Sequence, residues 1–269
     1  MGFTIVGDTP LKHTRWYRVD TNDTLYKGQL VKATSDGVLP MGAASGVADT
    51  SNKSVPWGIV IGTSDYEPTF SADYGGDYIT GVTTQAAIAA RKNAHVEGQN
   101  PKGDKAAYVH VARIFPDTLI CGPIFNAAYG TAITEFANTV ASTDGLGITK
   151  ASTIGFTPVA DKATAYCRTG ANAGVYRITT NTSTTAYTWT HAMGADIAVG
   201  DKFVYVPLRD VGPSFAQFDA QSTYIEGGNS ASLATNYYII NVEYLDLEKA
   251  GEEKCFFTFG MDHFCPVRA

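Results

Sequence analysis

Short runs of apolar and β-branched residues, separated by glycine- or asparagine-containing turns, recur through the second half of this chain. The runs cover residues 153–157, 163–168, 174–180, 186–190 and 202–207. Turns are expected at 170–172, 181–183 and 200–201, where glycine, asparagine and serine gather. Strands spaced by about 8–12 residues with such turns between them are typical of a β-sandwich or β-barrel. Core positions of that unit are expected at Val175, Ile178, Tyr187 and Trp189.

A first β unit is expected over residues 23–125. Its strand-like runs are 25–33, 38–41, 55–62, 106–114 and 118–125, with tight turns at 35–37 and 115–117. Residues 1–22 are polar and aromatic without a clear period, which predicts an extended N-terminal arm lying on its own domain or on a neighbouring subunit. We therefore expect an arm over 1–22, a β domain over 23–125 and a second β domain over 126–269.

The last part of the chain predicts a long hairpin. Residues 237–247 alternate between apolar and polar side chains, residues 248–254 are rich in charge, and residues 255–259 are apolar again. The charged segment is expected at the tip of the hairpin, where its charges oppose edge-to-edge aggregation.

Helices are expected at only two places, residues 83–92 and residues 131–140. The chain contains 32 Thr and 27 Gly, and only 17% of its residues are charged. Threonine favours pleated sheets, and glycine favours turns. The sequence therefore predicts a mainly β fold with two small β-barrel or β-sandwich units, an extended N-terminal arm and one or two short helices.

The charge of the chain limits its partners. The net charge is −6 and the pI is about 5.3, so neither nucleic acid nor an anionic membrane surface is expected as a partner. No apolar run approaches the roughly 18 residues of a membrane span, and residues 1–8 do not read as a secretory signal. We therefore expect no membrane association and no secretion.

No arrangement of side chains points to catalysis. The five histidines lack metal-ligand spacing, and no G-x-S-x-G or phosphate-binding glycine motif occurs. No C-x-x-C pair occurs, so we expect no zinc site and no disulfide framework, with thiols kept reduced in a cytoplasm. The sequence thus predicts a protein without catalytic residues, metal or cofactor, and not an enzyme.

Three alternatives stay open at this stage. Cys255 and Cys265 could face each other across a hairpin. The acidic loop with Asp65, Glu67, Asp73 and Asp77 could bind Ca²⁺, which takes six to eight oxygen ligands. An enzyme whose two carboxylates lie far apart in the sequence would also escape detection.

Two stretches of the first β unit carry a resemblance. The stretch from Asp23 to Pro40, with its Gly28-Gln29-Leu30-Val31 run and Asp36-Gly37 turn, is followed by Trp57-Gly58-Ile59-Val60-Ile61-Gly62. This order resembles the head decoration (cement) proteins of tailed bacteriophages. Residues 174–179 and 197–204 also look like β domains of phage virion proteins. Small members of the decoration family lack a second β domain such as 126–269.

The resemblance implies a virion protein on the outer surface of a phage capsid, assembled in the host cytoplasm. Its partners would be the major capsid protein and further copies of itself, in a homotrimer or another oligomer. Its function would be to stabilise contacts between major capsid subunits. Such contacts use aromatic and apolar patches. The candidate interface residues are Trp16, Tyr17, Tyr66, Phe70, Tyr74 and Tyr78, with the alternative that they cover the protein's own barrel.

Other functions remain open beside this one. A head fibre, tail tube or baseplate component would keep the protein in the virion at another place. A carbohydrate-binding β-sandwich would use exposed aromatic rings to stack on sugars. A major capsid subunit fits less well, because the common fold of that protein needs a long spine helix and no window of that length occurs.

Overall fold

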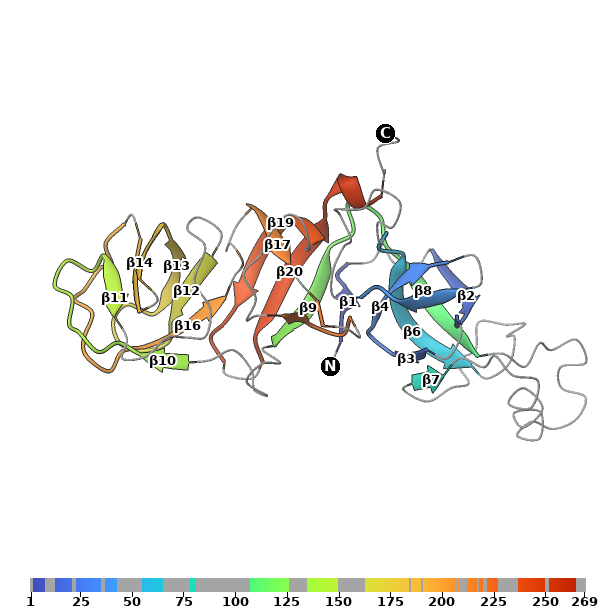
Figure 1. Ribbon diagram of the computed structural model, residues 1–269, viewed down its shortest axis with the longest axis horizontal. Coiled ribbons are helices and arrows are strands. Elements are labelled where there is room, and N and C mark those ends of the chain that lie inside the picture. Colours follow the sequence, from blue (N-terminus) through green and yellow to red (C-terminus); the bar gives the residue numbers. More distant parts are fainter. Residues whose placement is uncertain are drawn as a thin grey trace, which may run out of the picture.

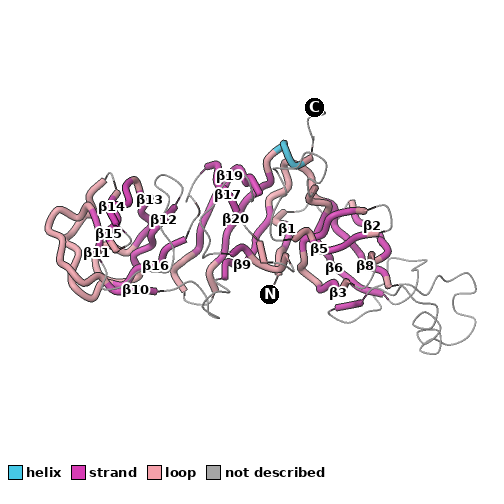
Figure 2. Tube along the Cα trace, viewed as in Figure 1, coloured by secondary structure: helices cyan, strands magenta, loops and turns pink. Residues whose placement is uncertain are grey.

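The protein is mainly β, as its sequence predicts. The computed structural model describes residues 2–7, 13–20, 23–34, 37–42, 55–64, 78–80, 107–125, 135–149, 163–183, 185–189, 191–206, 208, 212–216, 218–219, 222–226, 237–249 and 252–264. Within these residues the one helical element is the short 3-10 helix η3, Met261–His263 (Figure 2). All other regular elements of the described chain are strands.

A small barrel forms one end of the molecule (Figure 1). Its strands follow the order β2 (Thr14–Arg18), β8 (Tyr108–Arg113), β6 (Gly58–Ser64), β4 (Leu30–Ala33) and β5 (Val38–Pro40). A parallel bridge between Val19 and Val38 brings the end of β2 beside β5, so the sheet curls on itself. Branched side chains fill the interior, among them Val31, Val60 and Val111. A separate ribbon pairs β3 (Thr24–Tyr26) with β7 (Tyr78–Thr80).

A six-stranded sheet forms the middle of the molecule. Five strands follow the order β1 (Thr4–Ile5), β9 (Ile120–Phe125), β20 (Lys254–Phe259), β19 (Tyr237–Asp246) and β17 (Gly212–Ala216). The short strand β18 (Ile225–Glu226) joins β9 in parallel. Strands β19 and β20 pair antiparallel as far as Asp246 and Lys254, so the long C-terminal hairpin predicted from the sequence is confirmed.

Two further sheets form the other end of the molecule, and we call residues 135–206 the distal lobe. One sheet follows the order β10 (Glu135–Ala137), β16 (Lys202–Val206), β12 (Ala163–Cys167) and β13 (Gly174–Ile178). The other follows the order β11 (Gly147–Thr149), β15 (Ala186–Thr188) and β14 (Thr180–Ser183). As predicted, Ile178, Tyr187 and Trp189 are buried in the core of this lobe. Val175 is half-buried against the neighbouring core of the central sheet.

Strand β16 is buried on both faces. Phe203 and Tyr205 point into the core of the distal lobe, and Val204 and Val206 belong to the core of the central sheet. Because alternate residues of a strand point to opposite faces, one strand serves two cores. The same central core also takes Leu30 from the barrel. The sheets therefore follow one another as packed layers along the long axis (Figure 1).

The distal lobe is an insertion into the central sheet. Its strands β10 to β16 lie in the chain between β9 and β17, which both belong to the central sheet. The predicted boundary between domains 23–125 and 126–269 therefore differs from the observed division. Strand β9 lies between β1 and β20, because the apolar run 120–125 completes a sheet built mainly from the end of the chain.

The described parts of the predicted N-terminal arm lie on the protein's own sheets. Strand β1 pairs with β9, and strand β2 pairs with β8 over all five of its residues. Phe3 is 1% exposed, and its amide donates a hydrogen bond to the carbonyl of Gly28 (2.6 Å). The arm was expected to lie either on its own domain or on a neighbouring subunit. Its described residues lie on the protein's own sheets.

Two local predictions are wrong. A helix was expected over 131–140, but residues 135–137 form strand β10, where Phe136 stacks on Phe203 across the pair with β16 (6.1 Å between ring centroids). Residues 181–183 were expected to turn, but they belong to strand β14, which pairs with β15 through a bulge. The predicted helix 83–92 and Cys265 lie outside the described residues.

Candidate functional site

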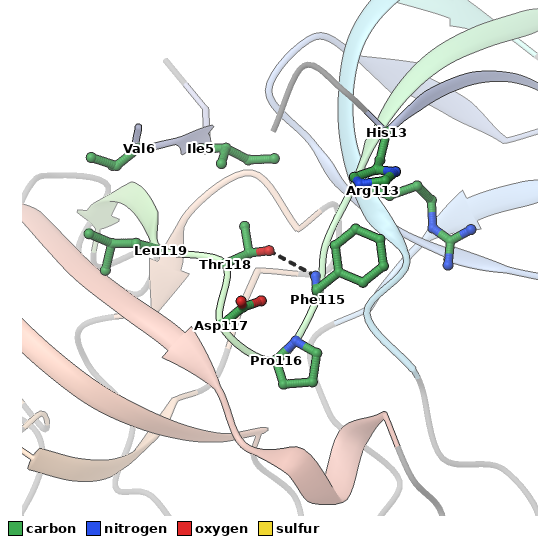
Figure 3. A pocket seen from close by; sticks show the side chains of 9 residues that line it. All are labelled: Ile5, Val6, His13, Arg113, Phe115, Pro116, Asp117, Thr118 and Leu119. Atoms are coloured by element: carbon green, nitrogen blue, oxygen red, sulfur yellow. Dashed lines mark hydrogen bonds between the residues drawn. The ribbon is translucent and has the colours of Figure 1, made fainter. Parts of the chain in front are cut away.

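A pocket of about 550 Å³ lies where the chain passes from the barrel to the central sheet. Its walls come from the connection between β8 and β9, from the end of β1, and from His13 (Figure 3). This volume is within the range of about 300–1,000 Å³ that small-ligand sites occupy. The pocket is therefore the first place to look for a binding function.

A tight turn at Phe115–Thr118 shapes the pocket. The amide of Phe115 donates to the hydroxyl of Thr118, and the amide of Thr118 donates to the carbonyl of Phe115 (both 2.9 Å). Pro116 suits the second position of such a turn, because its ring fixes φ near −65°. The opposite wall is tied to the turn by the amide of Val6, which donates to the carbonyl of Leu119 (2.9 Å). Both walls are thus held by backbone hydrogen bonds.

The lining combines an apolar wall with an aromatic ring and one carboxylate. Ile5, Val6 and Leu119 form the apolar wall. Phe115 is 38% exposed, and the edge of His13 lies against it (5.2 Å between ring centroids). The carboxylate is that of the exposed Asp117. Chemically, this arrangement offers an apolar surface that ends at a negative charge.

Arg113 also lines the pocket, but its charge is held elsewhere. The guanidinium carbon lies 3.4 Å from the centroid of the Trp57 ring and 5.9 Å from that of Phe115. A guanidinium nitrogen donates to the hydroxyl of Tyr17 (3.5 Å). Figure 3 shows the guanidinium beyond the Phe115 ring and directed away from Asp117. The guanidinium of Arg113 therefore contacts residues of the barrel, and the aliphatic part of its side chain lines the pocket.

The candidate interface residues Trp16 and Tyr17 pack on the protein's own barrel. Trp16 is half-buried and stacks on His110, with 4.7 Å between ring centroids and an interplanar angle of 11°. Tyr17 lies edge-on to Trp57 (6.1 Å between centroids) and contacts the barrel interior. Both residues thus contact the protein's own barrel, and a role of either one at an interface stays a prediction.

The other four candidate interface residues follow β6 in the chain. Tyr66, Phe70 and Tyr74 lie outside the described residues, and so do Asp65, Glu67, Asp73 and Asp77, the possible Ca²⁺ ligands. Tyr78 begins strand β7, but its side chain is not among the described ones. A role of these residues at an interface stays a prediction.

An ionic cluster with a buried centre, not foreseen from the sequence, joins the distal lobe to the central sheet. Arg168 follows β12, and its side chain is 6% exposed. It donates to the carboxylate of Glu253 (2.5 Å), to the carbonyl of Leu247 (3.0 Å) and to Glu135 (3.3 Å). Lys202 also binds Glu135 (2.8 Å). This hydrogen bond from Lys202 is the main cause that lowers the pKa of Glu135 below its usual value.

Glu253 belongs to the hairpin segment that the sequence assigned to a solvated, charged tip. Its side chain is instead 0% exposed. The neighbouring pair of Lys249 and Glu252 does lie in solvent. Glu253 differs from Glu252 in its ion pair with Arg168. Because Arg168 lies 85 residues away in the chain, the sequence around Glu253 gives no sign that this side chain is buried.

The loops of the distal lobe expose apolar side chains. Val140 is 56% exposed and Val199 is 66% exposed. Their loops are tied together by the Asn138 amide, which donates to the carbonyls of Val140 (2.6 Å) and Ala198 (3.1 Å). No sequence pattern points to these valines, since a single apolar residue in a polar loop carries no signal of exposure.

The described cysteines are free and lie away from solvent. Cys167 and Cys255 are buried, and Cys121 is half-buried. Burial raises the pKa of all three thiols. Among the described residues, no group of three His, Cys, Asp or Glu is placed to hold a metal ion. In the same part of the chain, no helix has the length and apolar character needed to cross a membrane.

Comparison with known proteins finds no match. No family model, no curated protein and no solved structure matches this chain.

Proposed function

We propose that this protein is a structural component of a phage virion that binds the outer surface of the capsid and stabilises contacts between major capsid subunits. The residues that carry the resemblance to decoration proteins, 23–40 and 57–62, supply β4, β5 and β6 of the barrel and strand β3 beside it. The sequence resemblance thus coincides with one structural unit. That coincidence supports the proposal.

The observation that carries the proposal is the exposed pair Val140 and Val199 at the end of a layered body. The two valines lie on loops that the Asn138 side chain links, and exposed apolar surface is typical of protein contact sites. The barrel and the distal lobe are linked through the shared core of the central sheet. A protein built in this way can hold contacts at separated places without bending between them.

A decoration protein stabilises its shell by mass action. Its binding site on the capsid exists only when neighbouring subunits are assembled, so binding favours the assembled state. The proposal needs broad surface contact on a rigid body and self-association into a homotrimer or another oligomer. Mass measurement of the isolated protein in solution tests the self-association separately.

The test uses capsids produced from the same genome in a strain lacking this protein. Purified protein added back should co-sediment with the capsids and raise the temperature at which they rupture. The variant Val140→Asp/Val199→Asp should bind at least tenfold more weakly. The matched control is Met261→Asp, which places a carboxylate at a residue 55% exposed but outside the lobe.

Three outcomes decide the question. Equal rupture temperatures with and without the protein would remove the capsid function. Full binding by the valine variant would show that the distal loops are not the contact. Copy number separates the alternatives, since a decoration protein approaches one copy per capsid subunit and a fibre, tail-tube or baseplate component does not.

A further inference from the structure

We propose that the pocket between the end of β1 and the turn Phe115–Thr118 binds a basic side chain, lysine or arginine, of a partner protein. The inference does not depend on the capsid function, because it concerns the chemistry of the pocket itself. It starts from the three kinds of surface that meet there: aliphatic, aromatic and carboxylate.

The aliphatic surface suits the stem of a basic side chain. Val6 is 39% exposed at the pocket, and Ile5 and Leu119 continue the same wall. Lysine and arginine bury their methylene stems along apolar surface while the charged end reaches a polar group. Each methylene that leaves water can tighten binding by up to about fourfold. The wall thus favours a long flexible chain.

The charged end has two groups to meet. The Asp117 carboxylate is exposed, and no described residue forms a hydrogen bond or ion pair with it. The exposed ring of Phe115 belongs to the same turn, two residues before Asp117 (Figure 3). An ammonium or guanidinium is attracted both by a carboxylate and by an aromatic face. The net charge of −6 favours the approach of a cationic group.

The basic side chains of the pocket, Arg113 and His13, are directed to other groups. Arg113 lies over the Trp57 ring and binds Tyr17, on the far side of Phe115 from Asp117. His13 lies against the ring of Phe115, and its carbonyl accepts a hydrogen bond from the Arg113 amide (3.0 Å). An anionic ligand would have to displace Arg113 from Trp57, whereas a cationic one meets Asp117 directly.

The test measures binding of three small probes with equal chains to the full-length, isotope-labelled protein. Hexylammonium, hexan-1-ol and hexanoate are titrated at pH 7 and constant ionic strength, and amide chemical shifts are followed. Hexylammonium is expected to shift the amides of residues 5–6, 115 and 117–119 saturably and to bind two- to fivefold tighter than hexan-1-ol, as expected for a solvent-accessible ion pair. Hexanoate is expected to bind more weakly than hexan-1-ol.

Substitutions identify the groups responsible. Asp117→Asn should remove the preference for hexylammonium and leave hexan-1-ol binding unchanged, and Asp117→Ser gives a second variant should the first disturb the turn. Phe115→Leu should reduce the same preference while it keeps an apolar wall. Asp196→Asn removes one exposed carboxylate from the distal lobe and should change nothing.

Each contrary result is decisive. Equal affinities of hexylammonium and hexan-1-ol, a preference for hexanoate, or no saturable shift at the pocket would overturn the inference. A preference kept by the Asp117 variants would place the cation site elsewhere. Because capsid binding is measured separately, failure of the pocket leaves the proposed function standing, and failure of capsid binding leaves the pocket standing.

Discussion

Replacing Arg168 with methionine is expected to destabilise the distal lobe by about 3–5 kcal/mol, because the change leaves a buried carboxylate without its cation. The side chains of Arg168 and Glu253 are 6% and 0% exposed, and their charged atoms are 2.5 Å apart. Methionine keeps an apolar stem of similar length, so the loss is mainly electrostatic and not a loss of packing.

The interactions lost in this variant contribute unequally to the expected destabilisation. Most of it comes from the loss of the ion pair between Arg168 and Glu253, since the Glu253 side chain is fully buried. Loss of the hydrogen bond to the Leu247 carbonyl adds about 1 kcal/mol. Glu135 adds less than about 1 kcal/mol, because it is 33% exposed and keeps its bond to Lys202.

Urea unfolding followed by Trp189 fluorescence measures the effect. Trp189 is buried in the distal lobe, and the other two tryptophans, Trp16 and Trp57, can be replaced with phenylalanine so that only the lobe is observed. Arg168→Met/Glu253→Met should recover most of the lost stability, because no charge is left buried. Lys249→Met, at a residue whose side chain is 72% exposed, is the control and should change stability by less than about 0.5 kcal/mol. A single variant that costs under about 1 kcal/mol, or a double variant no better than the single, would refute the reasoning.

Three further predictions concern other parts of the fold. Gly122→Ala should destabilise the central sheet by about 1–3 kcal/mol in urea unfolding, since the added carbon would lie 2.1 Å from atoms of the Phe3 ring, and Phe3→Leu should relieve part of that loss. Glu135 has a pKa below the usual 4.5, so its contribution to stability is present above pH 4.5 and is lost as pH falls through the lowered folded value. Glu135→Gln should therefore show a shallower loss of stability in acid. Burial raises the pKa of Tyr187 from 10.0 to about 12, so stability should fall as pH rises from 10 towards 12, and Tyr187→Phe should flatten that fall.

Local alternation was enough to predict most strands and part of the core. Ile178, Tyr187 and Trp189 were assigned to a core from their spacing within strand-like runs, and all three are buried. This works because side chains alternate across a strand, so a run of a few residues already shows which face is apolar. The Phe115-Pro116-Asp117 turn was also predicted from a local signal, since the proline ring fixes the backbone angle φ at its own position.

The sequence could not show where distant segments meet. The pairing of β9 with β20 joins Cys121 to Phe256, and the pocket brings Ile5 beside Leu119. Neither pairing leaves a local signal, so the inserted lobe and the pocket were both missed. The helix predicted over residues 131–140 was wrong for a related reason. The Asn138 side chain accepts a hydrogen bond from the Thr149 amide (3.0 Å), and such tertiary bonds override a weak helical preference.

The way in which the lobe is inserted bears directly on what the molecule can do. An inserted domain joined only by two linkers would move relative to its host. Here Tyr166, Val204 and Val206 place one face of the lobe in the core of the central sheet, and Arg168 closes the same junction with buried hydrogen bonds. A lobe separated from the sheet would expose those apolar side chains to water, so moving it away costs free energy in proportion to the area uncovered. The exposed Val199 therefore belongs to a lobe that is packed on the central sheet. A body of this kind can transmit load between separated contacts, which is the mechanical property that the proposed capsid function requires.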